Sequence, residues 1–403
     1  MKNTLLYFLI SFIHCVNAHA QCPEDILFLS QQELDDFATT YPNCTQIEGD
    51  VEIGMFGIST DVDNLEPLNQ ITTIEGNLRI DSNDNLSNLN GLDSLNTIGG
   101  TLNIAYNNAL VDLSGLGTIT DIGGDLRLQF NADLIDLNGL NNLKTIGEDF
   151  SFSNNNALNS LNGLQQLNSI GGELRLFSNN VLTDLSGLEG LDSVEGNFII
   201  QFNPAIASLN GLNNMNTIDG NCIIQFNAAL TTLAALENLT MIDGYLDIDN
   251  NAILTSLTGL DNIDHTSITN LQLFENPMLS ICGVPSVCDY LEDTGTYEIY
   301  DNALGCNTAE ETGCLVATTQ VEYSSFSMFP NPARHQIYLQ LEEETNVVQI
   351  RIISISGKVM YQQIIDNLGV APVAFELTSY PPGMYFLSVD DGKELMSKCF
   401  VKH

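Results

Sequence analysis

A period of 24 residues governs most of this 403-residue chain. The triplet apolar-x-Gly, or a near variant of it, recurs eight times at that interval from Ile74 onward. Further columns that begin at Leu78, Ile80 and Asn83 keep the same step, and the asparagine column is unbroken. One copy of so short a unit cannot bury its apolar side chains alone. Successive copies must therefore stack, and the sequence predicts a solenoid with one continuous core.

Each part of the repeat has a physical reason. The unit is L-x-I-x-x-N-x-x-L-x-x-L-x-G-L-x-x-L-x-x-I-x-G-x. L-x-I alternates with a period of two, which predicts a short strand with both apolar residues on one face. The asparagine that follows is expected to point inward and to bond backbone groups left unpaired at the bend, so that stacked copies form a ladder. The glycines are expected where the chain turns with positive φ or where backbones approach closely.

This pattern resembles the leucine-rich repeat and, more closely, the receptor L-domain family of right-handed β-solenoids, over roughly residues 45–280. The resemblance implies an all-β-dominated fold in which residues 47–280 form the solenoid and their strands stack into a parallel sheet.

The ends of a solenoid expose its core unless they are capped. Residues 21–46 are expected to form an N-terminal cap that a Cys22–Cys44 disulfide would hold, and residues 281–314 resemble the C-terminal cap of bacterial L-domain-like proteins. Four cysteines there allow three pairings. Cys282 and Cys306 are one repeat apart, which favours Cys282–Cys306 with Cys288–Cys314. The alternative, a zinc site, lacks any C-x-x-C pair. Cys222 replaces an inward leucine and is expected to be a small buried hydrophobe, whereas Cys399 has no assigned role.

The first twenty residues have the features of a secretory signal peptide. Lys2 precedes an apolar run over residues 5–13, and Ala18-His19-Ala20 is a small-x-small cleavage site before Gln21. A lipoprotein would need a cysteine directly after the cut, and Cys22 is one residue too late. Export permits disulfides, and no other apolar stretch is long enough to span a membrane.

The repeat ends before residues 315–325, which are expected to be a linker. Residues 326–403 contain short alternating strands separated by turn residues, which predict a small antiparallel, Ig-like β-sandwich. The order of its motifs resembles the type A sorting domain of the type IX secretion system of Bacteroidota. The matching residues are Pro330, Asn331, Pro332, Gly357, Lys358, Pro382, Gly383 and Tyr385. The resemblance implies contact with the type IX machinery, passage across the outer membrane, and release or attachment to surface lipopolysaccharide. The alternative is a structural Ig-like domain that stays in place.

Charge narrows the choice of partners. Residues 21–325 carry 4 basic and 43 acidic side chains. Such a domain repels nucleic acid and anionic membrane surfaces. Cations, glycans and proteins remain as partners, and the charge is equally explained as a means of keeping a repetitive surface soluble.

Signals for catalysis are weak. The histidines after the signal peptide are His265, His335 and His403, and none has a recognisable nucleophile partner. No phosphate-binding glycine loop and no cofactor motif is present. The enzyme alternative is a polysaccharide lyase or hydrolase, because such enzymes also use β-solenoids and carboxylates are abundant. Uniform coils do not build the cleft that those enzymes use, so we expect no enzymatic activity. A surface spacer without a ligand is a third possibility.

The outward side of the strands is the natural binding surface of a solenoid. Three of the four basic residues of the solenoid lie in one outward column, and aromatic residues precede several of the ladder asparagines. The predicted ligand-binding face comprises Arg79, Tyr106, Arg127, Phe130, Arg175, Phe177, Phe202 and Phe226. Such a face suits a glycan or a protein, and the expected role is recognition or adhesion at the cell surface.

Two structural explanations compete with this interpretation. The aromatic residues could stack on one another as packing, and the arginines could pair with Asp125 and Glu173, two residues earlier. Asp125, Asp149 and Glu173 also form one column of neighbouring carboxylates, whose repulsion calcium would relieve.

Overall fold

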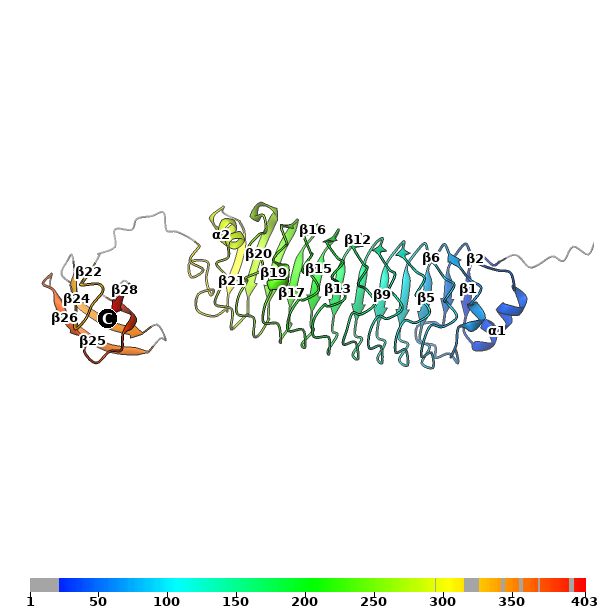
Figure 1. Cartoon of the computed structure of the whole chain (residues 1–403), viewed down its shortest axis with the longest axis horizontal. Helices are drawn as coiled ribbons and strands as arrows, with labels where there is room; N and C mark the ends of the chain where they lie inside the picture. The colour runs from blue at the N-terminus through cyan, green and yellow to red at the C-terminus, as the bar shows by residue number, and fades with distance from the viewer. Residues whose placement is uncertain are drawn as a thin grey trace, which may run out of the picture. The chain divides into compact units, whose positions relative to one another are not determined.

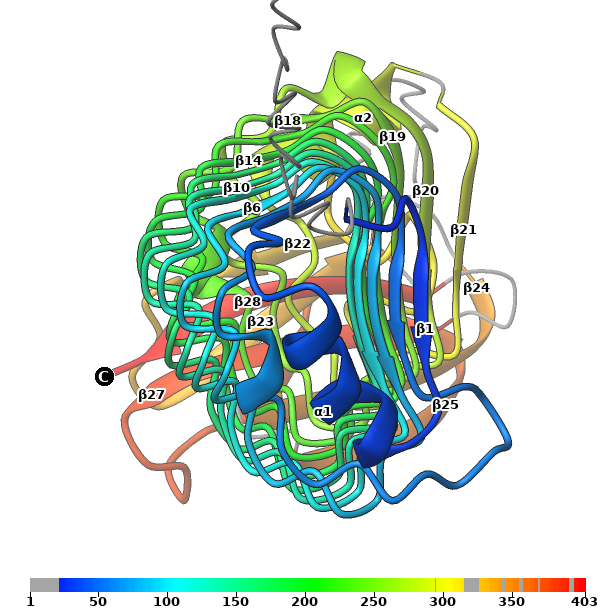
Figure 2. The same ribbon diagram turned by 90° about the vertical axis from the view of Figure 1, so that its right-hand side faces the viewer.

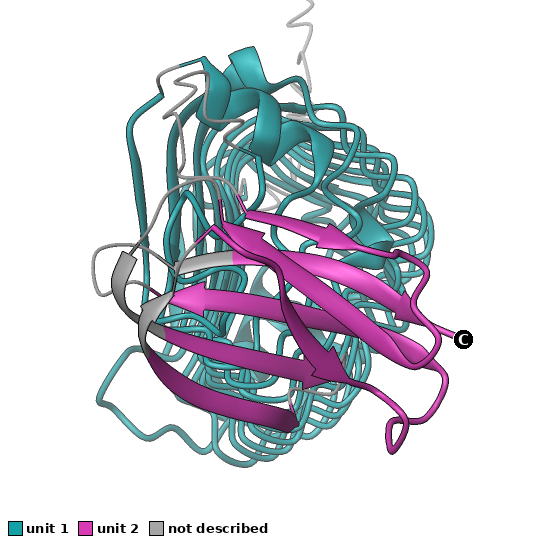
Figure 3. Cartoon of the chain, turned by 90° about the vertical axis from the view of Figure 1, so that its left-hand side faces the viewer, with its two compact units in different colours: residues 1–316 teal, residues 317–403 magenta. Residues whose placement is uncertain are grey.

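The computed structural model describes residues 22–293, 295–314, 326–341, 345–354, 358–368, 370–390 and 395–403. The chain forms two compact units, residues 1–316 and 317–403, coloured separately in Figure 3. The predicted signal peptide, the predicted linker and Gly357 lie outside the described residues.

Unit 1 is the predicted solenoid, with coils stacked in a single row (Figure 1). One strand per coil joins a twelve-stranded parallel sheet, here called the long sheet. Its strands are, in order, β1 (Ile26–Phe28), β3 (Val51–Ile53), β5 (Leu78–Asp81), β7 (Leu102–Ala105), β9 (Leu126–Gln129), β11 (Phe150–Ser153), β13 (Leu174–Phe177), β15 (Phe198–Gln201), β17 (Cys222–Gln225), β19 (Gly244–Asp249), β20 (Ile268–Phe274) and β21 (Tyr297–Tyr300).

Two-residue strands form a second, nine-stranded parallel sheet, here called the short sheet. They are β2 (Gln46–Ile47), β4 (Thr73–Ile74), β6 (Thr97–Ile98), β8 (Asp121–Ile122), β10 (Thr145–Ile146), β12 (Ser169–Ile170), β14 (Ser193–Val194), β16 (Thr217–Ile218) and β18 (Met241–Ile242). Equivalent residues of successive coils pair in register, as Leu102 does with Leu126. The apolar columns are buried between the two sheets, and Leu102 and Ile104 have no exposed surface. The predicted burial pattern is therefore confirmed.

The asparagine column forms the predicted ladder. The backbone N–H of Asn131 donates to Oδ1 of Asn155 at 3.0 Å, and its Nδ2 donates to the carbonyl of Ile104 at 2.9 Å. The same bonds continue into the last coil, where Asn276 donates to Asn302. At the first end Thr60 replaces an asparagine, and its hydroxyl donates to Asn83 at 2.6 Å. Buried backbone groups at the bend thus find partners in every coil.

The turns differ from the expectation in one respect. Gly139 and its equivalents have positive φ, as predicted. The residue before each ladder asparagine also has φ between 53° and 60°, although it is never glycine. These residues are Ser82, Tyr106, Phe130, Asn154, Ser178, Phe202, Phe226, Asn250, Glu275 and Asp301. Bulky side chains rarely adopt this conformation, so stacking between coils must hold it.

Both ends of the solenoid carry a cap, and Figure 2 shows the N-terminal end in front. Helix α1 (Gln31–Thr40), capped by Ser30, buries Leu34 and Phe37 against the first coil. Helix α2 (Pro285–Glu292) packs at the other end, after the 3₁₀ turn η3 (His265–Ser267). The disulfides join the predicted pairs, Cys22–Cys44, Cys282–Cys306 and Cys288–Cys314. Strands β1 and β21 lie within the predicted cap segments and extend the long sheet, so both caps are continuous with the coils.

Unit 2 is the predicted antiparallel sandwich. One sheet contains β22 (Phe326–Phe329), β23 (Gln336–Leu341) and β26 (Val373–Glu376). The other contains β25 (Val359–Leu368), β24 (Thr345–Ser354), β27 (Gly383–Asp390) and β28 (Leu395–Lys402). Ile352, Phe375 and Phe400 are among the side chains of its core. In the described part of the chain, no helix has the length and apolar character needed to cross a membrane.

Candidate binding face

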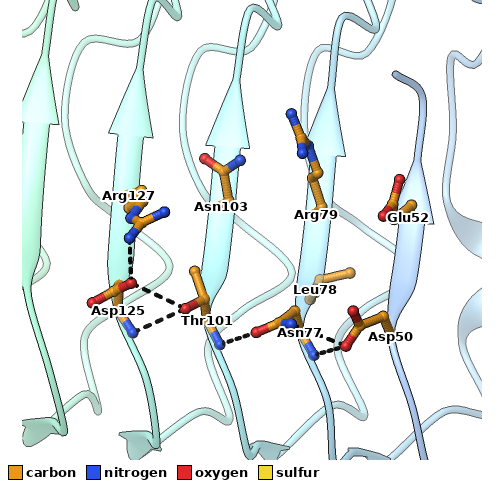
Figure 4. Close-up of a pocket in the computed structure, with 9 residues that line it drawn as sticks. All are labelled: Asp50, Glu52, Asn77, Leu78, Arg79, Thr101, Asn103, Asp125 and Arg127. Carbon is orange, nitrogen blue, oxygen red and sulfur yellow. Dashed lines mark hydrogen bonds and ion pairs between the residues drawn. The ribbon is translucent and has the colours of Figure 1, made fainter. Parts of the chain in front are cut away.

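A shallow depression of about 280 Å³ lies on the outward side of the long sheet, over β3, β5, β7 and β9. Figure 4 shows Glu52, Arg79, Asn103 and Arg127 side by side on these strands, one from each coil. They form one column because outward positions of an in-register parallel sheet align. The rest of the lining is formed by Asp50, Asn77, Leu78, Thr101 and Asp125.

The two arginines are held by carboxylates. Nη2 of Arg127 lies 2.6 Å from Oδ2 of Asp125, the predicted pairing. Arg79 bonds Asp81 instead, at 3.0 Å through Nη2, because Asn77 occupies the position two residues before it. The side chains of Arg79 and Arg127 remain 41% and 49% exposed. Since guanidinium has five donors and each carboxylate uses only some of them, both arginines keep donors for a ligand.

Asn103 stands between the two arginines. Its side chain makes no hydrogen bond to any described residue, and it is half-buried. Thr101 behind it is already engaged, because its hydroxyl bonds Asp125 at 3.2 Å. The depression therefore offers a free amide between two guanidinium groups, with the carboxylate of Glu52 at one end.

An aromatic row, here called the first rail, borders the same coils. Phe56, Tyr106 and Phe130 follow β3, β7 and β9, and their ring centroids are 4.9 Å and 4.7 Å apart. Phe56 reaches Tyr106 past Ser82, whose small side chain leaves room. Phe56 is 61% exposed and was not predicted as a site residue. The available signal was the insertion of about three residues in its coil, before Leu65.

The remaining predicted residues form a separate group further along the sheet. Arg175 lies 5.3 Å from the ring of Phe177, and its Nη1 is 3.9 Å from Glu173, its predicted partner. Phe177, Phe202 and Phe226 form a second rail, with centroids 5.2 Å and 4.5 Å apart. The eight predicted residues are thus brought together as two groups of four, because Ser151 and Asn154 occupy the coil between them.

Ring geometry limits what the rails can do. Tyr106 and Phe130 stack with an interplanar angle of 5°, as do Phe202 and Phe226. The facing ring surfaces are therefore covered, and the exposed parts of the middle rings are their edges. These rings pack on one another and yet stay partly exposed to solvent, since 39% of the surface of Phe130 is exposed. A ligand would contact a row of edges rather than insert between rings.

The carboxylate column has partners within the chain. Oδ1 of Asp125 accepts from the backbone N–H of Asp149 at 2.9 Å, and Oδ1 of Asp149 accepts from the N–H of Glu173 at 2.8 Å. Asp50, Asn77 and Asn197 make the equivalent bond in their coils. These bonds form a second ladder, which the sequence analysis missed. They give the carboxylates of Asp125 and Asp149 a structural role, and that of Glu173 accepts from Nδ2 of Asn197 at 3.0 Å. Binding of calcium to this column stays a prediction.

Other candidate chemistry is sparse in the described residues. They contain no cluster of three or more His, Cys, Asp or Glu side chains arranged to hold a metal ion. Nε2 of His265 lies 2.9 Å from Asp293, in the C-terminal cap. Cys222 is fully buried, as predicted, and burial raises the pKa of its thiol to about 12. Burial, and then the charge of Asp249, raise the pKa of Asp247 to about 7.

The motif residues of unit 2 hold its last strand. Asn331, between Pro330 and Pro332, accepts from the N–H of Val401 at 3.0 Å and donates to the carbonyl of Cys399 at 3.2 Å. Nζ of Lys398 donates to the carbonyl of Phe326 at 2.6 Å, which ties β28 to β22.

The other motif residues shape the turns next to β24 and β27. Gly383, after Pro382, begins β27 opposite Lys402. The hydroxyl of the buried Tyr385 donates to the carbonyl of Pro381 at 2.8 Å. The N–H of Lys358 donates to Ser354 at 3.3 Å. Cys399 is exposed on β28.

Comparison with known families agrees with both units. The receptor L domain family matches residues 43–111, which include β3, β5 and β7 beneath the depression. The secretion system C-terminal sorting domain matches residues 327–403. No curated protein matches the chain. A sorting domain of this type directs its cargo through the type IX secretion machinery. The chain is therefore a secreted or cell-surface protein in which a receptor L-domain β-solenoid is joined to a C-terminal type IX secretion sorting domain.

Proposed function

We propose that the solenoid recognises a neutral glycan outside the cell, through the depression around Asn103 and the first rail beside it. The observation that carries the proposal is the unpaired Asn103 amide between the exposed guanidinium groups of Arg79 and Arg127. Planar polar groups that are already oriented by neighbours suit sugar hydroxyls, which both donate and accept hydrogen bonds.

Charge favours a neutral ligand over an acidic one. Each arginine is locally compensated by a carboxylate, and Asp50 and Glu52 line the same depression. The field of the whole acidic solenoid also slows the approach of polyanions. Glu52 supplies an acceptor next to the arginine and amide donors, so one ligand with several hydroxyl groups can satisfy both kinds of group.

Removing Arg127 and Phe130 together tests this proposal. Glycan-array screening of the exported protein against neutral and acidic oligosaccharides identifies a ligand, and calorimetry measures its affinity. We expect Arg127→Ala/Phe130→Ala to lose at least about tenfold in affinity, since an arginine and an aromatic contact are each worth on the order of 1 kcal/mol or more. Lys144→Ala is the matched control: it removes the only solenoid cation outside the column, on an exposed side chain.

The alternatives give different results in the same experiment. Release of new reducing ends from a polysaccharide identifies an enzyme. Binding to proteins but to no glycan would keep recognition as the function and reject a glycan as the ligand. No binding at all, with a folded protein, indicates a surface spacer. Retention on the cell after removal of the sorting domain, with a lipopolysaccharide fragment detected by mass spectrometry, distinguishes surface attachment from release.

A further inference from the structure

Two carboxyl groups lie together on the outward side of the long sheet, near its C-terminal end. Asp247 and Asp249 occupy alternate positions of β19, so they share a face. Only 6% of Asp247 and 3% of Asp249 is exposed. On the neighbouring strand β17, Nε2 of Gln225 donates to Oδ2 of both carboxyl groups at 2.7 Å. One amide group thus bridges two nearly buried carboxylates.

One oxygen of this pair lacks a donor. Oδ1 of Asp247 is inaccessible to solvent and accepts no hydrogen bond from the described residues. Oδ1 of Asp249, in contrast, accepts from Nδ2 of Asn250 at 3.1 Å. A buried carboxylate oxygen without a donor or a cation is costly. The arrangement is therefore incomplete as it stands.

Among the described residues, no lysine or arginine lies near the pair to complete it. The charged groups that face the pair from the following coils are Glu275 and Glu298, both acidic, with the phenol of Tyr300 beside them. No lysine or arginine occurs between Arg175 and Arg334. This distinguishes the pair from Asp125, which has Arg127 and a backbone N–H.

We propose that Asp247 and Asp249 bind a divalent cation of the Ca²⁺ class. Ca²⁺ prefers carboxylate and amide oxygens, tolerates irregular geometry and completes its coordination with water. The amide of Gln225 can turn by 180°, which exchanges its nitrogen for its oxygen and provides a third protein ligand. In the turned position Oε1 points to the ion. Gln201, whose Nε2 now donates to Oε1 of Gln225, must turn as well, so that its own Oε1 accepts from Nε2 of Gln225.

The site joins two consecutive coils. Gln225 belongs to β17 and the two aspartates to β19, and β20 and β21 follow. A bound ion would hold the end of the long sheet together at the point where the acidic side chains gather. Ion binding is therefore expected to stabilise the solenoid, independently of any ligand on the depression around Asn103.

Thermal unfolding of the exported protein, stripped with chelator and then titrated with CaCl₂, tests the site. We expect Tm to rise by several degrees in the wild type. The rise should be lost in Asp247→Asn, which keeps the shape of the side chain and its bond to Gln225. Asp133→Asn, an exposed acidic side chain elsewhere on the solenoid, is the matched control and should respond like the wild type.

Calorimetric titration supplies a readout that does not depend on folding stability. One Ca²⁺ per chain that disappears in Asp247→Asn and persists in Asp133→Asn supports the site. An equal response in all three proteins would show only diffuse attraction by the acidic chain and would overturn the proposal. Absence of any response in the folded wild type would overturn it too. Oδ1 of Asp247 would then carry a proton instead of binding an ion.

Discussion

At the scale of single residues, each ladder asparagine makes several buried hydrogen bonds that join neighbouring coils of the solenoid. Oδ1 of Asn155 accepts from both the backbone N–H and the side chain of Asn131. Its own Nδ2 donates to the carbonyl of Leu128 at 2.9 Å. All of these groups are buried, so none can turn to water when the asparagine is removed.

Replacement of Asn155 by alanine should therefore destabilise the folded solenoid by about 2–5 kcal/mol, the cost of leaving two or three buried polar groups unpaired. The measurement is the free energy of unfolding from urea titration of the exported protein. Asn159→Ala is the control on the same coil, because that side chain is exposed, and it should change the free energy of unfolding by less than about 0.5 kcal/mol. Equal effects of the two substitutions would show that the ladder contributes nothing to stability.

The sequence predicted the first ladder but not the second, and the reason is chemical. The asparagine bond needs an acceptor and an amide donor on one short side chain, so the column is uniform from Asn83 onward, and Thr60 takes the place only at its first end. The second ladder needs only an acceptor oxygen opposite the N–H of the next coil. Asp50, Asn77 and Asp149 satisfy it equally. A column of mixed residues has no visible period, so it escaped detection.

At the scale of the coil, local sequence selects the type of turn. Most coils place glycine with φ between 106° and 117° at the turn after the ladder. In two coils Pro67 and Ala235 stand at the equivalent positions. Both residues lie in 3₁₀ turns, η1 (Glu66–Leu68) and η2 (Ala234–Leu236). A 3₁₀ turn has negative φ, which proline and alanine accept.

The coil turns yield a paired prediction with opposite signs. Gly139 has φ of 112°, and a Cβ there would lie 2.0 Å from the carbonyl oxygen of Leu113. Gly139→Ala should therefore lower the free energy of unfolding by more than about 1 kcal/mol. A Cβ added at Gly117 would meet no atom within 4 Å. Gly117→Ala should therefore leave the free energy of unfolding unchanged or raise it by about 0.4–1 kcal/mol. Chemical denaturation of both variants checks the difference in sign.

The left-handed corners mark where sequence reasoning fails at this scale. Tyr106 and Phe130 have φ of 58° and 56°, which their side chains disfavour. Strand and turn propensities cannot predict such a conformation, because its cause is the stack of neighbouring coils. The same stack aligns the aromatic residues into rails, and the coil with Ser151 and Asn154 separates the predicted face into two groups. Whether those groups bind a ligand was not predictable from packing rules, since edge-exposed rings serve packing and recognition alike.

At the scale of the whole molecule, the two units differ in charge and in task. Residues 21–325 carry 4 basic and 43 acidic side chains, whereas residues 326–403 carry 6 and 8. Two of the basic residues, Lys398 and Lys402, lie on the last strand, where Lys398 bonds the carbonyl of Phe326. The sorting domain thus differs in net charge from the solenoid, and it is the domain that directs export through the secretion machinery.

Asn331 offers a way to test that division. Its two hydrogen bonds to β28 fix the strand at the C-terminal end of the chain. Asn331→Ala should loosen that strand at a cost of about 1 kcal/mol, because the side chain is exposed. If the machinery recognises the folded end of the sandwich, the fraction of protein outside the cell should fall severalfold. The solenoid itself should keep its thermal transition, since Asn331 belongs to the other compact unit.

Export is measured by immunoblotting of medium, surface and periplasmic fractions. Arg334→Ala, an exposed change three residues further on, is the control for a nonspecific effect of surface mutation. Normal export of Asn331→Ala, together with a lowered sandwich stability, would show that the machinery tolerates a loosened β28 and recognises another part of the domain. Loss of export with both transitions unchanged would instead mean that Asn331 is contacted directly by the machinery, because its amide would then act without stabilising the fold.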